Sequence, residues 1–163
     1  MWRNQLEGAR DLYLASSPDG GATFRPAEKL GRGTWPLDAC PMDGGAVAAG
    51  PDGRVETVWM RAGSMYAARP GEPERGLGRG VQGWTAVGPE GSYSVWLKKR
   101  PGRLLALTPK GGSPVTLAEH ASDPVVAAAP GGLGPVVAVW ESKSEEGGLL
   151  ALVLSASERK SSR

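Results

Sequence analysis

Short apolar runs separated by glycine and proline recur along this chain, and the pattern predicts β-strands rather than helices. Helical periodicity is weak, and the frequent Gly and Pro residues leave little room for a helix of useful length. Three Pro-x-Gly turns, which begin at Pro51, Pro89 and Pro130, each follow one apolar run and precede another that ends in Val-Trp. The sequence therefore has an internal repeat of roughly 40 residues.

Each repeat contains up to four predicted strands. The first strands are expected at 46–49, 84–87 and 125–129. The second strands end at Trp59, Trp96 and Trp140, and Trp2 occupies the equivalent position. Third strands are expected at 12–16, 65–68, 104–108 and 149–154, and fourth strands at 28–30, 75–77 and 115–117. Four short antiparallel strands in a repeat of this length are typical of a β-propeller blade.

We therefore predict an all-β fold, a β-propeller of four-stranded antiparallel blades with about three and a half blades present. The propeller segment is expected to span residues 1–154, with blades at 1–33, 34–80, 81–120 and 121–154, and a polar tail at 155–163. The first blade lacks its innermost strand and most of its second, and the last blade lacks its fourth. One interpretation is part of a larger ring; the other is a four-bladed ring closed by pairing of the two partial blades. Open end blades would expose apolar faces and unpaired edges, which favours self-association.

Residues 17–24 read Ser-Pro-Asp-Gly-Gly-Ala-Thr-Phe and predict a tight turn between two strands. The Ser17 hydroxyl and the Asp19 carboxylate can accept hydrogen bonds from the backbone N–H groups of the turn itself. Gly21 permits the positive φ that short turns need. Thr23 and Phe24 are expected to begin the next strand, with the phenylalanine ring tucked between sheets.

The same stretch fits the pattern S-x-D-x-G-x-T-[FW] and resembles the Asp-box, or BNR repeat, of sialidases and related β-propellers. A degenerate copy lies at 108–115, where Lys110 replaces the aspartate. The resemblance implies a sialidase-like ring of six blades, of which this chain would be about half. It also implies a structural role for the Asp-box residues on the face opposite the active site. Relatives of this kind are commonly exported bacterial proteins, but the first residues are not a signal peptide, so the localisation stays open.

In an antiparallel blade, the loops between second and third strands share one face with the links between blades, and in sialidases that face holds the active site. A sialidase binds its substrate carboxylate with three arginines, because a planar guanidinium pairs with a carboxylate in a bidentate manner. By resemblance, Arg3, Arg10 and Arg61 are the candidate anion-binding residues; the alternative is that they are solvated loop residues. Trp35 could stack on a sugar ring or pack between blades.

Two carboxyl groups on that face, Asp11 and Asp43, could act as a general acid if burial raised the pKa. A structural ion pair with a neighbouring arginine is the alternative for Asp11. Cys40 could be a nucleophile, but His120 is the single histidine, and a small buried core residue is the favoured interpretation of the cysteine. The chain lacks the His and Cys count of a zinc site, and no metal or cofactor is expected.

Composition excludes several classes of function. The chain has 163 residues and a formal net charge of +2, with no Lys/Arg block interleaved with aromatic residues, so a nucleic-acid partner is not expected. It has no apolar run of about 18 residues, so no membrane span is expected. The single cysteine excludes an internal disulfide.

Two functions follow from the resemblance. The first is a glycoside hydrolase-like protein related to exo-α-sialidases that binds or cleaves acidic sugars. The alternative is a non-catalytic β-propeller that binds a protein or a glycan. The family nucleophile is a tyrosine assisted by a glutamate, whereas Tyr13, Tyr66 and Tyr93 fall inside predicted strands and look structural, so catalysis stays open. The partners expected are a carbohydrate ligand and either a second copy of the chain or the missing blades of a longer chain.

Overall fold

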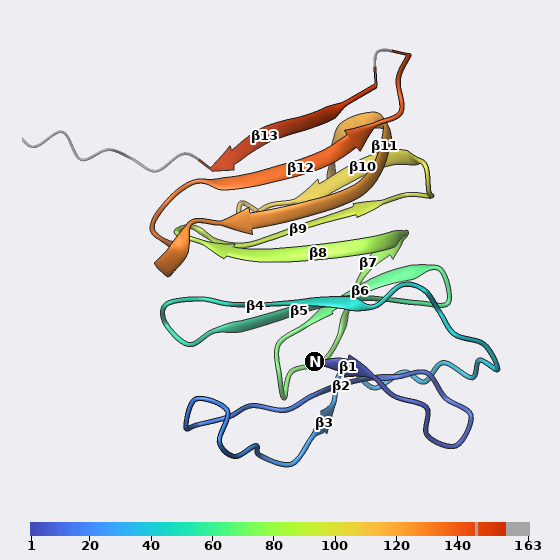
Figure 1. Ribbon diagram of the computed structural model, residues 1–163, viewed down its shortest axis with the longest axis vertical. Helices are drawn as coiled ribbons and strands as arrows, with labels where there is room; N and C mark the ends of the chain where they lie inside the picture. The colour runs from blue at the N-terminus through green and yellow to red at the C-terminus, as the bar shows by residue number, and fades with distance from the viewer. Residues whose placement is uncertain (146, 156–163) are drawn as a thin grey trace, which may run out of the picture.

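The computed structural model describes residues 1–145 and 147–155, which form three antiparallel sheets stacked along the longest axis (Figure 1). The first sheet contains β1 (Trp2–Arg3), β2 (Leu12–Leu14) and β3 (Glu28–Lys29). The second contains β4 (Gly45–Ala49), β5 (Val55–Arg61), β6 (Ser64–Ala68) and β7 (Arg75–Arg79). The third contains β8 (Val81–Gly88), β9 (Gly91–Leu97), β10 (Gly102–Leu107), β11 (Val115–Ala128), β12 (Val136–Ser142) and β13 (Leu149–Ser155). A short 3-10 turn, η1 (Pro130–Gly132), connects β11 to β12. The predicted all-β class is confirmed.

The third sheet differs from the expectation of two separate blades. β11 pairs with β10 from Val115 to Ala121 and with β12 from Ala121 onwards, with a bulge in the second pairing between Ser122 and Val125. The six strands thus form one curled, half-barrel sheet. The first and last sheets lie at opposite ends of the stack in Figure 1, and β1 and β13 belong to different sheets, so the described strands do not close a four-bladed ring. Ser155 ends β13 rather than beginning a tail, and residues 156–163 lie outside the described part.

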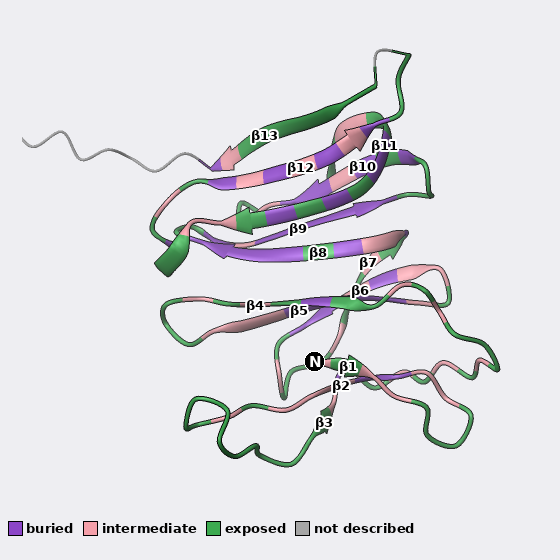
Figure 2. Ribbon diagram, viewed as in Figure 1, coloured by how far each residue is buried: buried purple, intermediate pink, exposed green. Residues whose placement is uncertain are grey.

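Burial between the sheets follows the tryptophan repeat (Figure 2). The four tryptophans have equivalent partners on the third strand of each repeat: Trp2 pairs with Tyr13, Trp59 with Tyr66, Trp96 with Leu105 and Trp140 with Leu150. Trp59, Trp96 and Trp140 are at most 6% exposed. Trp59 and Trp96 pack between sheets, as predicted, whereas Trp140 packs inside the curl of the third sheet. Trp2 is 42% exposed, since none of the described sheets packs against its side of the first one.

The inner strands lie side by side: β4 packs on β8, and β8 packs on β11. Glycine makes this approach close, since a Cβ at Gly83 would lie 2.2 Å from the Met65 side chain and one at Gly80 would lie 2.4 Å from the Trp96 ring. The β4–β5 and β8–β9 turns lie on the left in Figure 1, with the turn at 17–24, and the beginnings of β4 and β8 lie on the right. The two sides of the stack therefore carry different sets of loops.

The turn at 17–24 has the predicted hydrogen bonds. The Ser17 hydroxyl accepts a bond from the Gly21 N–H (2.7 Å), and Asp19 accepts bonds from the Thr23 N–H (2.8 Å) and the Thr23 hydroxyl (2.6 Å). The expectation for Phe24 was wrong, because its ring is 65% exposed rather than packed between sheets. The next strand, β3, begins only at Glu28.

These bonds give the turn a measurable acid response. The hydrogen bonds from Thr23, of which the hydroxyl's is the strongest influence, lower the pKa of Asp19 to about 2. Their stabilising effect is complete above the ordinary aspartate pKa of about 3.9 and is lost as the pH falls through about 2. We expect Thr23→Val to raise the pKa of Asp19 towards its ordinary value in a ¹³C NMR titration of side-chain carboxyls. Thr116→Val, an exposed threonine elsewhere, is the control; an ordinary pKa for Asp19 in the wild-type chain would contradict the prediction.

Candidate functional site

A pocket of about 380 Å³ with a mixed polar and apolar lining lies at the beginnings of β4 and β8 and at the bulge of β11. We call it the inner-strand pocket. It is lined by Met42–Gly45, by Gln82–Trp84 and by Asp123–Val125. The first segment leads into β4, the second lies in β8 and the third lies in the second half of β11. Equivalent positions of three successive repeats thus converge on one surface depression, on the right-hand side of Figure 1.

Bulges create the pocket wall. The register of β8 against β9 shifts between Val81 and Trp84, and that of β11 against β12 shifts between Ser122 and Val125. Within these shifts Gln82 has φ +53° and Asp123 has φ +49°, in the left-handed region that non-glycine residues rarely adopt. A bulge bends the strand and redirects a side chain, and bulges are common next to binding sites. Here they bring the Gln82 and Asp123 side chains together.

Hydrogen bonds connect the polar side chains of the pocket. Asp43 Oδ2 accepts a bond from the Gln82 backbone N–H (2.7 Å), and Gln82 Nε2 donates to Asp123 Oδ1 (2.8 Å). Arg100 Nη2 donates to both Asp123 oxygens (2.8 and 3.0 Å). Gln82 Oε1 is buried with no hydrogen-bond partner among the described residues. The Trp84 ring beside this network is 46% exposed.

The environment drives the pKa values of the two carboxyl groups apart. Burial raises the pKa of Asp43, and this effect outweighs the Gln82 N–H and the charge of Arg3, which both lower it. The hydrogen bond from Gln82, followed by that from Arg100, lowers the pKa of Asp123. Two carboxyl groups in one pocket whose pKa values are shifted in opposite directions resemble the pairs that general acid–base chemistry uses.

Arg3, a predicted anion-binding residue, lies between the first two sheets. Its Nη1 donates to the Arg10 carbonyl (2.6 Å), and its Nη2 donates to the carbonyls of Asp43, Gly44 and Met60 at 2.8 to 3.3 Å. The guanidinium also stacks over the Trp35 ring, 5.3 Å from its centroid. Arg3 therefore directs its donors to the backbone of the protein itself.

Arg61 and Arg10, the other two predicted anion-binding residues, lie in different surroundings. Arg61 forms a bidentate ion pair with Glu74 (2.8 and 2.6 Å), which lowers the pKa of Glu74, and its guanidinium lies 4.0 Å from the Tyr66 ring centroid. Arg10 buries its Nε with no hydrogen-bond partner among the described residues. Neither residue lines the inner-strand pocket.

Of the remaining candidates, only Asp43 reaches that pocket. Asp11 is 7% exposed, forms an ion pair with Lys29 (2.7 Å) and accepts a bond from the Trp35 N–H (2.9 Å), so it has a structural partner, although a lysine rather than the expected arginine. The half-buried Trp35 ring packs against the hydrophobic cluster between the second and third sheets. Cys40 is exposed, so its interpretation as a buried core residue was wrong.

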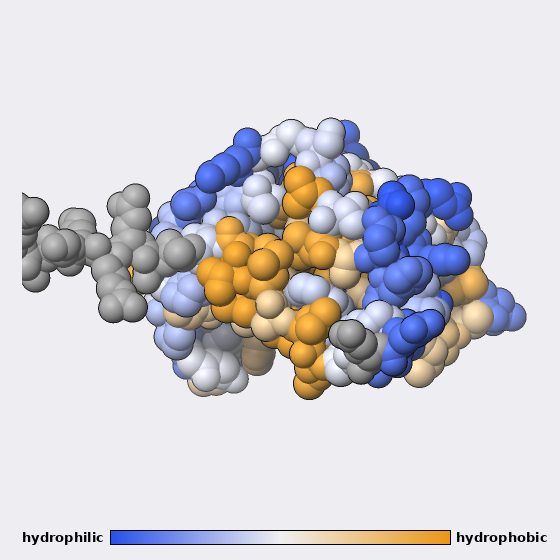
Figure 3. Space-filling model, turned by 90° about the horizontal axis from the view of Figure 1, so that it is seen from above, coloured by the Kyte–Doolittle hydropathy of each residue, from blue (hydrophilic) through white to orange (hydrophobic). Residues whose placement is uncertain are grey.

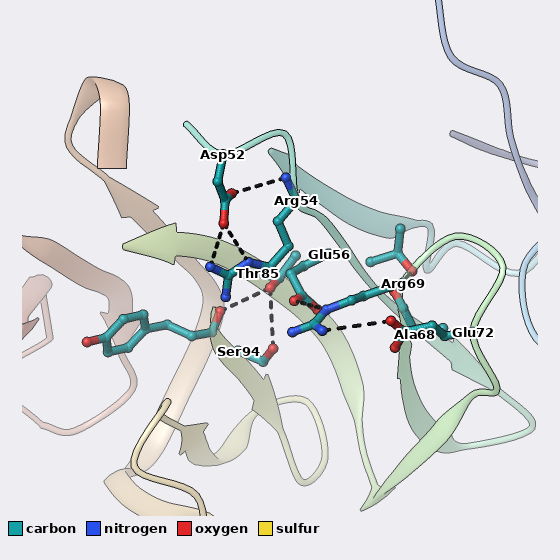
Figure 4. A network of polar contacts seen from close by, with 10 residues as sticks. Asp52, Arg54, Glu56, Ala68, Arg69, Glu72, Thr85 and Ser94 are labelled. Carbon is teal, nitrogen blue, oxygen red and sulfur yellow. Dashed lines mark hydrogen bonds and ion pairs between the residues drawn. The ribbon is translucent and has the colours of Figure 1, made fainter. Parts of the chain in front are cut away.

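A second depression, of about 260 Å³, lies between the second and third sheets on the turn side (Figure 4). Several of its charged side chains are already paired: Arg54 with Asp52 (2.7 Å) and Arg69 with Glu56 (2.7 Å). The Thr85 hydroxyl donates to the Tyr93 carbonyl. Arg75 and Glu90 also line the depression.

Sequence reasoning missed the roles of Gln82, Trp84 and Asp123. The signal was present, since the repeat aligns Asp43-Gly44, Gln82-Gly83 and Asp123-Pro124 immediately before the apolar parts of the innermost strands. Polar residues at three equivalent positions facing one axis indicate a shared site.

Comparison with known proteins gives no match to any protein-family model or curated protein. No group of three or more His, Cys, Asp or Glu side chains suited to a metal ion occurs within residues 1–145 and 147–155. The same part of the chain contains no helix long and apolar enough to cross a membrane. The function is therefore argued from the site alone.

The contacts of Arg3 predict a structural effect. We expect Arg3→Ala to lower the free energy of unfolding by about 2 kcal/mol, because hydrogen bonds from a charged donor to carbonyls of two sheets are lost. Urea unfolding followed by tryptophan fluorescence measures the change, with Arg25→Ala, an exposed arginine, as the control. Equal unfolding midpoints for Arg3→Ala and wild type would contradict this role.

Proposed function

We propose that the sheets form a segment of a β-propeller and that the chain is a module that binds a glycan in the inner-strand pocket. The observation that carries the proposal is the hydrogen-bonded series Asp43–Gln82–Asp123 on successive inner strands, beside the half-exposed Trp84 ring. Ligand sites commonly combine a few convergent polar groups with an apolar surface. The pocket supplies both.

The chemistry of the lining favours sugar hydroxyls as the groups recognised. An ionised carboxylate only accepts hydrogen bonds, and a hydroxyl can donate to it. Among the described residues, only Oδ2 of Asp43 has a hydrogen-bond donor, which leaves Oδ1 to accept one from a ligand. The Trp84 indole offers a flat apolar face on which the C–H face of a sugar ring can lie.

The same contacts weigh against the acidic sugar of the sialidase hypothesis. The pocket contains two carboxyl groups, and a ligand carboxylate would be repelled by Asp123, which is held in its ionised form. Arg3 and Arg61 already donate to the backbone and to Glu74. A neutral glycan is therefore the better ligand.

Binding tests this proposal. We expect wild-type protein to bind a subset of neutral oligosaccharides on a glycan array and Trp84→Ala to weaken that binding at least tenfold by isothermal titration calorimetry. The matched control is Phe24→Ala, an exposed aromatic residue on the turn side. The proposal fails if binding is confined to sialosides, or if Trp84→Ala binds as well as wild type while keeping its circular dichroism spectrum.

Glycoside hydrolysis in the same pocket is the second candidate, and the raised pKa of Asp43 beside the ionised Asp123 favours it. Two carboxyl groups flanking the glycosidic bond are the usual requirement, one as acid and one as base or nucleophile. Asp43 is the acid in this arrangement.

We then expect Asp43→Asn to lower turnover of a bound oligosaccharide by about 100-fold or more while retaining its affinity. Product analysis by chromatography measures turnover, and Asp38→Asn is the control. Intact oligosaccharide after prolonged incubation with wild type would leave the chain as a binding module and exclude the hydrolase.

A further inference from the structure

The third strand of each repeat carries one residue at an equivalent position, which in the first three repeats faces the following repeat. Each of these residues is paired, on the neighbouring strand, with the residue directly after the repeated tryptophan. They are Leu12, Met65, Leu104 and Leu149. The first three are at most 2% exposed, whereas Leu149 is 77% exposed. Within the described residues, the last repeat therefore lacks the cover that each earlier one has.

The uncovered surface is a complete apolar sheet face, which we call the outer face. Side chains of directly paired residues point to the same side of an antiparallel sheet. The outer face therefore consists of Val125, Ala127, Val137, Val139, Leu149, Ala151 and Val153, together with Glu141 at its margin. Val136, Ala138 and Trp140 alternate with them and point into the core. Figure 3 views the stack from this end and shows the apolar side chains gathered there.

The opposite end of the stack carries the complementary surface. Trp2 stacks on Tyr13 with ring centroids 6.2 Å apart and planes at 26°, and Trp59 stacks on Tyr66 at 6.1 Å and 24°. The internal pair, Trp59 and Tyr66, packs against the first sheet, on Leu12 and Leu30. The Trp2–Tyr13 pair has the same geometry and no sheet against it, which leaves Trp2 42% exposed.

We propose that a second copy of this chain covers the outer face with its Trp2–Tyr13 surface. The contact repeats one that the chain already makes twice internally, at Trp59 on the first sheet and at Trp96 on the second. Each copy carries both halves of the contact, so two copies related by a two-fold axis satisfy all four exposed faces. Head-to-tail contacts of this kind either close or continue into filaments. Two copies are enough to close these contacts, so the particle is a dimer.

The solution mass of the purified chain tests this inference. We expect light scattering coupled to size exclusion to give twice the chain mass of 16.9 kDa. A charged side chain on either surface should abolish the contact between the copies. Leu149→Asp and Trp2→Asp should therefore each give monomers at micromolar concentration with an unchanged circular dichroism spectrum. The matched control is Val115→Asp, an exposed valine of the first half of β11 that lies on neither face.

Two outcomes overturn the inference. A wild-type monomer across the concentration range shows that a second copy does not cover the outer face. A dimer that Leu149→Asp dissociates and Trp2→Asp leaves intact shows that outer faces pair with each other.

An equimolar mixture of the two variants provides a positive test, since each retains one half of the contact and together they should form a heterodimer. None of these results depends on glycan binding.

Discussion

The packing of a tryptophan-bearing sheet face on the apolar face of the preceding sheet is the contact on which this structure depends. Burial of large aromatic side chains contributes most of the stabilisation in such an interface. Trp96 and Trp140 bury their indole N–H groups without a hydrogen-bond partner among the described residues, at a cost of about 1–3 kcal/mol each. Packing must outweigh that penalty at both positions. Glycines on the inner strands make it possible, because Gly80 and Gly83 leave room for the side chains of the neighbouring sheet.

The charged side chains mainly stabilise the packing of the sheets rather than bind a ligand. Arg3 reaches carbonyls on the first two sheets, and Arg61 holds Glu74 from the segment between β6 and β7. The Nη atoms of Arg3 donate to the protein backbone and those of Arg61 donate to one carboxylate, although the Nε of Arg3 is buried without a partner among the described residues. This explains why arginines that follow the repeated tryptophans are poorly placed to bind a substrate carboxylate.

Local features could be predicted from the sequence, whereas tertiary ones could not. The strands, the shared register of the tryptophans and the hydrogen bonds of Ser17 and Asp19 depend on residues close in the chain or related by the repeat, and these predictions were confirmed. Exposure of Phe24 and Cys40 was predicted wrongly, because both residues lie in loops outside the strands, where the local pattern does not show what packs against a side chain. The partners of Arg3 lie up to 57 residues away, beyond any local pattern. The two expected blades form one sheet because β11 continues from one into the other. The local sequence pattern does not predict that this strand remains continuous.

The pocket and the stack have a common origin in the repeat. The apolar run of each innermost strand starts on the same side of the stack. A polar residue just before that run therefore lies beside the equivalent residues of the neighbouring repeats. Left-handed backbone at Gln82 and Asp123 costs on the order of 1 kcal/mol or more each. The hydrogen bonds among Asp43, Gln82, Asp123 and Arg100 offset part of that cost, but a simple continuation of the strand ladder would avoid it altogether. Strain retained at equivalent positions of two repeats, beside a buried amide oxygen without a partner, is better explained by a ligand that occupies the pocket than by the needs of packing.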